Sequence, residues 1–422
     1  MPREAFRPRC KDRLKAIAGA TAIAVLVATA APASGAVPPP TPVPPHGSPS
    51  PFPRTLETPQ AETRTPKLDA PTALLADLDT GQTLFAKRAQ LRRPIASVTK
   101  IMTALLVLER SEPGQVVTVG RYPLPGTPGL SALGLKPGEK ITVGNLLYAL
   151  LLQSANDAAV VLADHVGGSQ RGFMKDMNDR ARALGLSRTR FFSPNGLDDR
   201  GYSTVADLAV LTREALEQPR FSEVVRTKFH TIPSKGPARR VQNRNVLLWL
   251  YPGTTGVKTG YTNQARYCLV ASAERGDRRL VAVILGSTKQ PFSEAAELLN
   301  YGFEAFERRA LVAEGEDLGE RLVGSTPVEI AAAEGLEVLV PGRAGDVRRR
   351  IDIDQRAAAS SPVAGDEVGT LVVSVPGQRL GEVPLVVSRM VALGAPPEGD
   401  WWSRALRAVG GSFSDALGGV FG

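Results

Sequence analysis

The sequence predicts an α+β fold in which an antiparallel sheet joins the two ends of a helical region. Apolar strand patterns occur early, at residues 73–78 and 83–86, and late, at 267–273 and 280–285, with helical patterns between them. The 422-residue length suggests two or three domains, and 43% hydrophobic with 22% charged residues is ordinary for a globular chain. This composition excludes wholesale disorder, a collagen-like fibre and a polytopic membrane protein.

The charge pattern and the rare residue types narrow the functional classes. Four of the nine net positive charges lie in residues 1–36, which hold six basic and two acidic residues, so the rest is only mildly basic. The run Arg348-Arg349-Arg350 is too short for a nucleic-acid stripe, and we expect no nucleic-acid partner. Three widely separated histidines and two cysteines predict neither a metal centre nor a disulfide scaffold, and no cofactor is expected.

The N-terminal segment predicts an exported protein. Residues 1–36 combine basic residues up to Lys15, an apolar stretch over 16–31 and the small residues Ser34-Gly35-Ala36, as in a cleaved signal peptide. A retained anchor is the alternative, because the apolar stretch is just short of the roughly 20 residues that span a bilayer. Residues 37–66 contain 11 prolines and predict an extended linker.

The early part of the central region predicts a hairpin followed by helices. Asp79-Thr80-Gly81-Gln82 separates the two early strands, as in a β-hairpin. Residues 97–110 are apolar on nearly every helical face, so this helix should be buried at the centre of its domain. Thr142 is placed to cap a helix that runs to about Gln153, and another is expected over 157–165.

The late part of the same region predicts a second hairpin and a closing helix. Residues 274–277 join the two late strands, and Ser293 is placed to cap a helix that runs to Arg308. The two hairpins therefore enclose the helices, which is the basis of the antiparallel sheet predicted above.

Ser97-Val98-Thr99-Lys100 opens the buried helix and is a candidate nucleophile motif. A spacing of three places Ser97 and Lys100 on one helix face. A serine hydroxyl attacks well only with a base in hydrogen-bond reach, and a lysine is such a base only when burial or another cation lowers its pKa. The helix N-terminus also favours the negative charge that develops. Alone, the same pattern also arises as a capping serine near a lysine.

Two further motifs follow along the chain. Ser154-Ala155-Asn156 lies where one helix gives way to the next, and Lys258-Thr259-Gly260 lies at a strand edge, where Gly260 permits a close backbone approach. Each match alone is weak. The three motifs in this order, over about 160 residues, are typical of β-lactamases and penicillin-binding proteins.

With these motifs the chain resembles the low-molecular-mass penicillin-binding proteins that act as D-alanyl-D-alanine carboxypeptidases. The resemblance covers roughly residues 68–390 and is carried by Pro94–Ala104, Leu152–Ala159, Tyr251–Gly253, Gly256–Thr262, Ser361–Val363, Gly365–Asp366, Val368–Gly369 and Val383–Leu385. It implies a β-lactamase/transpeptidase-like catalytic domain over 67–310, built as an antiparallel sheet with a helical cluster. A small all-β domain over 311–392 and a linker with a terminal helix over 393–422 would follow.

The resemblance also implies the catalytic roles. Ser97 would attack the carbonyl between two D-alanines and form an acyl-enzyme, with Lys100 as its base. Ser154 would relay the proton to the leaving amine. The backbone N–H groups of Ser97 and Tyr261 would form the oxyanion hole, where losing one donor typically costs about 10²–10³ in rate.

The remaining motif residues are implied to bind substrate. Asn156 would hold the substrate amide. Lys258 would keep Lys100 deprotonated and attract the terminal carboxylate, to which Thr259 would hydrogen-bond, while Gly260 leaves room for the backbone. No metal is implied.

Two positions depart from the family pattern and concern carboxylate recognition. The family usually continues the third motif with Ala-Gly, where this chain has Ala265-Arg266, and it commonly has an arginine where this chain has Pro291. Arg266 or Lys289 is a candidate replacement. The alternative is that both are solvated and Lys258 with Thr259 suffices.

The expected function is a serine D-Ala-D-Ala carboxypeptidase acting on peptidoglycan stem pentapeptides at the outer face of the cytoplasmic membrane or in the wall. β-Lactam antibiotics would acylate it. The alternatives are a DD-endopeptidase or β-lactamase on the same site, or a catalytically idle wall-binding protein. A β-lactamase would need a glutamate-activated water, and no Glu-x-x-x-Asn segment lies between Asn156 and Lys258.

The C-terminal segment predicts an amphipathic helix at the membrane surface. Between residues 401 and 421, apolar side chains recur at three- and four-residue steps, and Trp401 and Trp402 suit an interface. Arg404, Arg407 and Asp415 argue against a spanning helix. The alternative is that the apolar face packs on the protein's own β domain.

Overall fold

The computed structural model describes residues 65–120, 130–289, 291–342, 347–354, 362–376 and 378–391. The predicted signal peptide, nearly all of the Pro-rich linker and the predicted C-terminal helix lie outside these ranges. Among the described residues, no helix is both long and apolar enough to cross a bilayer.

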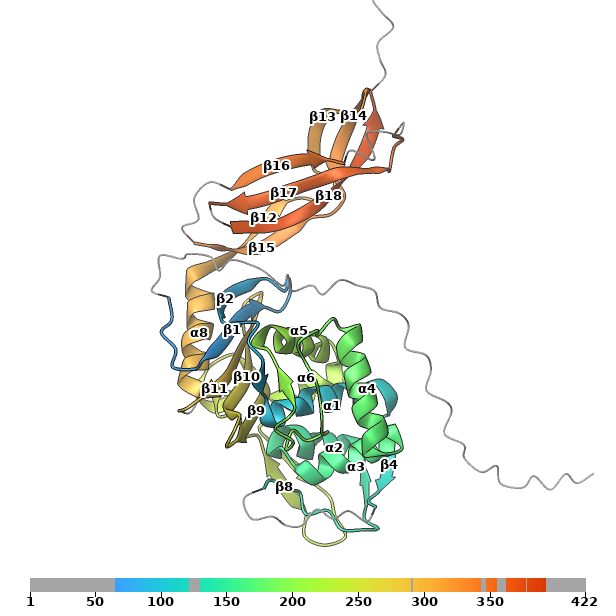
Figure 1. Ribbon diagram of the computed structural model, residues 1–422, viewed down its shortest axis with the longest axis vertical. Coiled ribbons are helices and arrows are strands. Elements are labelled where there is room, and N and C mark those ends of the chain that lie inside the picture. The colour runs from blue at the N-terminus through green and yellow to red at the C-terminus, as the bar shows by residue number, and fades with distance from the viewer. Residues whose placement is uncertain are drawn as a thin grey trace, which may run out of the picture. The chain divides into compact units, whose positions relative to one another are not determined.

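A five-stranded antiparallel sheet forms the centre of the larger part of the fold (Figure 1). Its strands, in the order β2-β1-β11-β10-β9, are β1 (Thr72–Asp77), β2 (Thr83–Lys87), β9 (Thr254–Thr262), β10 (Arg266–Arg275) and β11 (Arg278–Ser287). The first strand pairs with the late β11, with Thr72 opposite Leu285. The prediction that one sheet joins the early and late segments is therefore confirmed.

Both faces of this sheet are buried, because apolar residues continue through the strands instead of alternating with polar ones. In β11, Val281, Val283 and Leu285 belong to one hydrophobic cluster, and the intervening Ala282 and Ile284 belong to another. The first cluster contains α1 (Lys100–Arg110), and the second contains α8 (Phe292–Ala305). The sheet thus separates two apolar layers, and the motif-bearing helix lies in the larger one.

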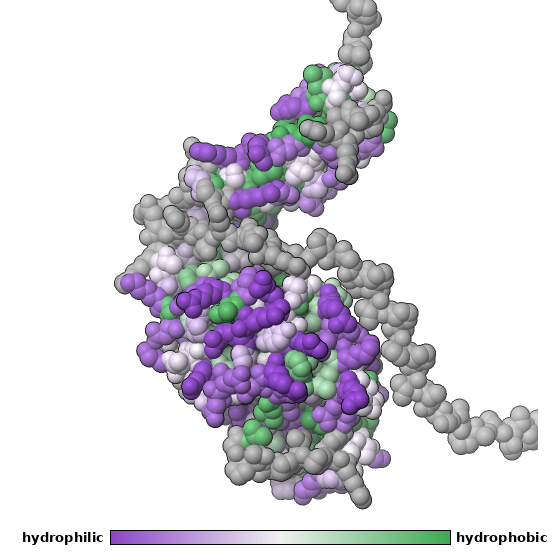
Figure 2. All heavy atoms as spheres, viewed as in Figure 1, coloured by the Kyte–Doolittle hydropathy of each residue, from purple (hydrophilic) through white to green (hydrophobic). Residues whose placement is uncertain are grey.

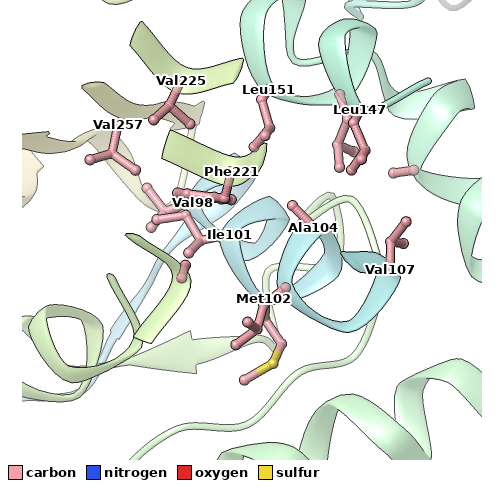
Figure 3. Close-up of a cluster of buried hydrophobic side chains, with 14 of the residues drawn as sticks. Val98, Ile101, Met102, Ala104, Val107, Leu147, Leu151, Phe221, Val225 and Val257 are labelled. Carbon is pink, nitrogen blue, oxygen red and sulfur yellow. The ribbon is translucent and has the colours of Figure 1, made fainter. Parts of the chain in front are cut away.

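The larger layer is helical. Besides α1 its helices are α2 (Val143–Tyr148), α3 (Asn156–Gly167), α4 (Gln170–Ala183), α5 (Val205–Leu216) and α6 (Pro219–Arg226). Eight consecutive residues of α1, from Lys100 to Val107, are buried, as predicted for a central helix. Figure 3 shows Ile101, Ala104 and Val107 of this helix among Leu147, Leu151, Phe221, Val225 and Val257.

Two helical segments near the motifs are not regular α-helix. The predicted helix start at Ser97 is a 3₁₀ turn, η1 (Ala96–Thr99), and α1 begins at Lys100. Thr142 caps α2 as predicted, accepting a hydrogen bond from the Asn145 N–H. The rest of that predicted helix is a π-helix, η2 (Ala149–Gln153). Such π segments are rare and occur often at functional sites.

Short elements join the helices. They are β3 (Arg93–Pro94) with β6 (Tyr202–Ser203), β4 (Val116–Thr118) with β5 (Lys140–Thr142), β7 (Phe229–Ile232) with β8 (Arg239–Gln242), and the short α7 (Leu247–Leu250).

The closing helix differs from its prediction at both ends. Ser293 does not cap it: α8 begins at Phe292, and Pro291 occupies the cap position, where no side chain accepts a capping hydrogen bond. The helix ends at Ala305, before the predicted Arg308, because Phe306 starts strand β12 (Phe306–Val312). That strand pairs with β15 (Leu336–Pro341). Because this partner lies further along the chain, the helical pattern of residues 293–308 could not indicate the pairing.

The C-terminal region is all β, as predicted. A five-stranded sheet has the order β13-β14-β18-β17-β16. Its strands are β13 (Asp317–Val323), β14 (Thr326–Ala332), β16 (Arg348–Ile353), β17 (Glu367–Val375) and β18 (Gln378–Met390). A third hydrophobic cluster, including Val328, Ile330 and Leu371, holds it together. The predicted domain boundary after residue 310 falls inside β12.

Candidate active site

The turn that carries Ser97 is held between two glycines. Ala96 has a left-handed φ of 48°, and a Cβ on Gly196 would lie 1.9 Å from the Ala96 carbonyl oxygen. On the other side, a Cβ on Gly260 would lie 3.1 Å from the Ser97 nitrogen. Gly196 therefore has no room for a side chain, and a Cβ at position 260 would push the backbone of η1 aside by a few tenths of an ångström, so β9 lies directly against η1.

Lys100 is fully buried and its amine has three oxygen partners. The Nζ atom lies 2.8 Å from Ser97 Oγ, 2.8 Å from Asn156 Oδ1 and 2.6 Å from the Asn195 carbonyl oxygen. A neutral amine has two N–H groups and one lone pair. The two oxygens that can only accept take the N–H groups, which leaves the lone pair directed at the Ser97 hydroxyl. This is the arrangement that a lysine base requires.

Electrostatics favour that neutral form. Burial lowers the pKa of Lys100 well below its usual value, and the positive charges of Lys258 and Arg244 lower it further, while Asp157 opposes them. Burial, assisted by Arg244, lowers the pKa of Lys258 to about 7. Lys258 donates a hydrogen bond to the Thr259 carbonyl oxygen at 2.7 Å.

The second motif is placed by the end of the π-helix. Ser154 ends η2 in a left-handed conformation with φ 62° and is buried. This conformation is unusual for serine and costs about 1–3 kcal/mol, which surrounding contacts must offset. It turns the chain so that Asn156 can begin α3. The Asn156 side chain accepts a hydrogen bond from Lys100, and its backbone N–H donates to the Ser131 carbonyl oxygen at 2.8 Å.

The segment 131–135 is tied to the site by a residue that the sequence analysis did not single out. The Asp157 carboxylate accepts hydrogen bonds from the backbone N–H groups of Leu133, Gly134 and Leu135, at 2.9, 2.8 and 3.1 Å. The only signal for this role in the sequence was that Asp157 directly follows the second motif.

Arg244 is a second residue missed from sequence. Its guanidinium donates to the Ser131 hydroxyl at 3.1 Å, and that hydroxyl donates to the Gln153 carbonyl oxygen at 2.6 Å. Its charge acts on both Lys100 and Lys258. Nothing in the sequence around residue 244 marks it, because its partners lie far away in the chain.

The third motif lies on β9, an edge strand of the sheet, so its outer edge is available to a peptide. Lys258 is buried, Thr259 is half-buried and Tyr261 is 49% exposed. The Tyr261 ring contacts Tyr267, with ring centroids 4.7 Å apart. Hydrogen bonds and close approaches therefore bring Ser97, Lys100, Asn156 and Gly260 together, with Lys258 electrostatically coupled to them.

The two candidate replacements for the missing arginine differ in their surroundings. Lys289 forms an exposed ion pair with Asp69 at 2.7 Å. Arg266 is exposed at the start of β10, has a φ of 60° and lies opposite Thr262. Arg244 is the arginine whose charge reaches both buried lysines. Within the described ranges, no group of three His, Cys, Asp or Glu side chains is arranged to hold a metal ion.

Comparison with known proteins identifies relatives across most of the chain. A family model described as D-alanyl-D-alanine carboxypeptidase matches residues 59–289. The D-alanyl-D-alanine carboxypeptidase DacF of Bacillus subtilis is 33% identical over 336 residues, which cover 75% of this chain and 84% of the relative. DacA of Escherichia coli, of the same description, is 31% identical over 359 residues, covering 81% of this chain and 87% of the relative.

A solved structure agrees with these sequence matches. Penicillin binding protein 5 from Haemophilus influenzae superposes with a TM-score of 0.67 at 28% identity, covering 78% of this chain and 99% of that chain. The similarity thus extends through both the helical region and the C-terminal β region.

Proposed function

The chain belongs to the D-alanyl-D-alanine carboxypeptidase family, and from that premise we propose that it is a serine D-Ala-D-Ala carboxypeptidase of the cell wall. It removes the terminal D-alanine from peptidoglycan stem pentapeptides, and β-lactam antibiotics acylate it. The observation that carries this proposal is the position of the buried Lys100 amine. It lies 2.8 Å from the Ser97 hydroxyl, and its two other partners, Asn156 Oδ1 and the Asn195 carbonyl oxygen, accept hydrogen bonds from its N–H groups.

In the acylation step, Ser97 Oγ attacks the carbonyl carbon between the two D-alanines while Lys100 accepts the hydroxyl proton. The backbone N–H groups of Ser97 and Tyr261 stabilise the oxyanion. When the C–N bond breaks, the proton passes through Ser154 to the leaving amine. Water then attacks the acyl-enzyme and releases the shortened peptide.

Substrate binding uses the cations around the third motif. Lys258 and Thr259 bind the terminal carboxylate, with Arg244 as the further cation that compensates for Pro291. Asn156 binds the substrate amide and orients Lys100, and Gly260 permits the peptide-binding strand to approach Ser97. A charge-assisted hydrogen bond of this kind is worth roughly 1.5–3 kcal/mol.

Mass spectrometry of D-alanine release from a synthetic pentapeptide, beside labelling with a fluorescent penicillin, tests the activity. Release together with labelling supports the proposal. Cleavage of a cross-linked muropeptide without release from the pentapeptide would instead indicate an endopeptidase. Rapid turnover of the penicillin would indicate a β-lactamase, and neither labelling nor release would indicate an idle wall-binding protein.

The location is part of the proposal. We propose export through the 1–36 signal, with 37–66 as a linker, catalytic residues within 67–310, a β domain over 311–392 and attachment to the membrane surface through 393–422. The sequence supports attachment by apolar burial, because between residues 400 and 421 two acidic residues balance two arginines and the apolar side chains share one helical face. Vesicle co-sedimentation of the full-length protein and of a version ending at Gly399 tests this, and equal binding by both would contradict it.

A further inference from the structure

Four large apolar side chains that project into solvent gather at one place beside the site. Leu250 is 72% exposed, and Phe229, Trp249 and Val246 are between 37% and 41% exposed. Val246, Trp249 and Leu250 follow a three- and four-residue spacing around α7, so they share one side of that turn. The Phe229 ring of β7 meets the Trp249 ring edge-on, with centroids 5.6 Å apart. These four residues are called the aromatic ledge below.

A cluster of exposed apolar side chains is uncommon on the surface of a soluble protein and often marks an interaction site. Figure 2 shows one face of the molecule, where small hydrophobic areas interrupt a largely hydrophilic surface. Other exposed large apolar side chains, such as Leu91 and Leu322, lie on other elements, far from the ledge along the chain.

Two cations accompany the aromatic rings. Lys228 Nζ lies 5.7 Å from the centroid of the Trp249 ring, and the Arg240 guanidinium lies 4.2 Å from that of Phe229. No carboxylate in the described part of the chain lies within ion-pair distance of either cation, although the neighbouring Arg239 is paired with Glu139. The ledge therefore presents aromatic faces and uncompensated positive charge together, which suits an anionic partner.

The ledge is continuous with the active site through one short segment. Arg244, whose charge acts on both buried lysines, precedes Val246 by two residues. Between them, the Asn245 side chain donates to the Gly256 carbonyl oxygen at 2.6 Å and so ties α7 to the strand that carries Lys258. A long substrate whose reacting end lies on β9 would meet the ledge where it leaves the site.

We propose that the aromatic ledge binds the polymeric peptidoglycan strand beside the peptide being processed. The apolar faces of its sugar rings stack on Trp249 and Phe229, and its acidic groups pair with Lys228 and Arg240. The continuity with the active site favours this wall polymer over a lipid surface. The inference rests on the proposed function, since it takes its ligand from the same substrate class. It predicts that the ledge matters for the polymer and not for a short peptide.

Binding to purified sacculi tests this proposal in the full-length Ser97→Ala background, where turnover does not alter the polymer. Two double variants are compared, Phe229→Ala with Trp249→Ala and Lys228→Glu with Arg240→Glu. The matched control is Leu322→Ala, which removes an exposed apolar side chain on β13. Each double variant should bind sacculi at least about tenfold more weakly, and the control should bind normally.

Three further measurements complete the test. In the Ser97-containing protein, both double variants should keep penicillin labelling and D-alanine release from a short pentapeptide within about twofold. Binding to vesicles of phosphatidylglycerol and phosphatidylcholine should not change. Unchanged sacculus binding in both double variants would overturn the proposal, as would a loss of vesicle binding with sacculus binding intact.

The charge-reversal variant keeps the apolar packing and so separates loss of binding from loss of folding. Failure of the unmodified protein to release D-alanine would overturn the proposed function alone, because sacculus binding needs no turnover and is read independently.

Discussion

At the scale of single residues, the buried amine of Lys100 is the centre of the candidate site. Its three oxygen partners come from one side chain on η1, one on α3 and one backbone carbonyl at Asn195. The two N–H groups of the neutral amine donate to Asn156 Oδ1 and the Asn195 carbonyl oxygen, so the lone pair points at the Ser97 hydroxyl. The three contacts thus orient the amine, while burial and the charges of Lys258 and Arg244 lower its pKa.

The first prediction concerns the nucleophile and its base. Ser97→Ala should abolish covalent penicillin labelling while the protein stays folded, because in the described part of the chain the Ser97 hydroxyl is the one hydroxyl that contacts the Lys100 amine. Lys100→Ala should lower acylation by about 10²–10⁴, the usual contribution of a positioned base. Gel fluorescence and thermal melting measure both effects. Undiminished labelling of Ser97→Ala, or near-normal acylation by Lys100→Ala, would contradict the assignments.

The second prediction concerns Arg244. Its positive charge lowers the pKa of Lys100 and of Lys258, so Arg244→Gln should raise both. The acidic limb of the pH profile for penicillin acylation, which reports deprotonation of the base, should therefore move to higher pH. The same variant should slow a free-acid peptide about tenfold more than its amide, because it removes a carboxylate partner.

Arg226→Gln is the matched control for Arg244, since Arg226 is an exposed arginine paired with Glu274. It should leave both the pH profile and the acid-to-amide ratio unchanged. An Arg244→Gln profile that coincides with the parent would show that Arg244 does not act on the lysines.

At the scale of elements, the site depends on how one helix start organises a loop. The first turn of α3 supplies Asn156 to Lys100 and Asp157 to the N–H groups of residues 133–135. That loop in turn carries Ser131, which accepts hydrogen bonds from the Asn156 N–H and from Arg244. Asp157 is therefore a positioning residue for groups that act on the base.

The third prediction tests that role. Asp157→Asn should leave backbone donors of the loop unsatisfied, at about 1–3 kcal/mol each, and should slow penicillin acylation about tenfold. Asp207→Asn is the matched control, because Asp207 also sits in a first helical turn and accepts from the Arg188 N–H and the Thr189 hydroxyl, at 2.9 and 2.7 Å. The control should lower the melting temperature without slowing acylation. Equal acylation rates in the two variants would refute the positioning role.

At the scale of the whole molecule, the burial of the two lysines of the site opposes folding at neutral pH. Lys258 has a pKa of about 7 in the folded protein, where burial penalises its charged form. An unfolded lysine keeps its proton to about pH 10. The unfolded state therefore binds more protons between about pH 7 and pH 10, and stability should increase with pH through that window. Lys100 acts in the same direction.

The fourth prediction follows from this imbalance. The free energy of unfolding should contain a term that rises by up to about 1.4 kcal/mol per pH unit above pH 7. Lys258→Met should remove that term, leave the part of the slope that comes from Lys100, and be the more stable protein near pH 7. Urea unfolding at several pH values measures both. An exposed lysine changed in the same way, Lys235→Met, should keep the parental slope, and a slope equally retained in Lys258→Met would contradict the prediction.

The sequence by itself determined the features that depend on residues near one another in the chain. The spacing of Ser97 and Lys100, the cap at Thr142 and the two hairpins are local, and the structure has each of them. The position of the early and late strands on either side of the helices also sufficed to predict a shared antiparallel sheet, which the pairing of β1 with β11 confirms. The order of the three motifs completed the family resemblance.

Only the tertiary structure decided the partners that complete the site. Asn195 meets Lys100 through a backbone carbonyl, and no side-chain type marks such an acceptor in a sequence. Arg244 reaches Ser131 across 113 residues, and α8 stops at Ala305 because β12 pairs with a strand some 30 residues further on. Such contacts arise when the folded chain brings distant segments together, so their energy is absent from any local pattern.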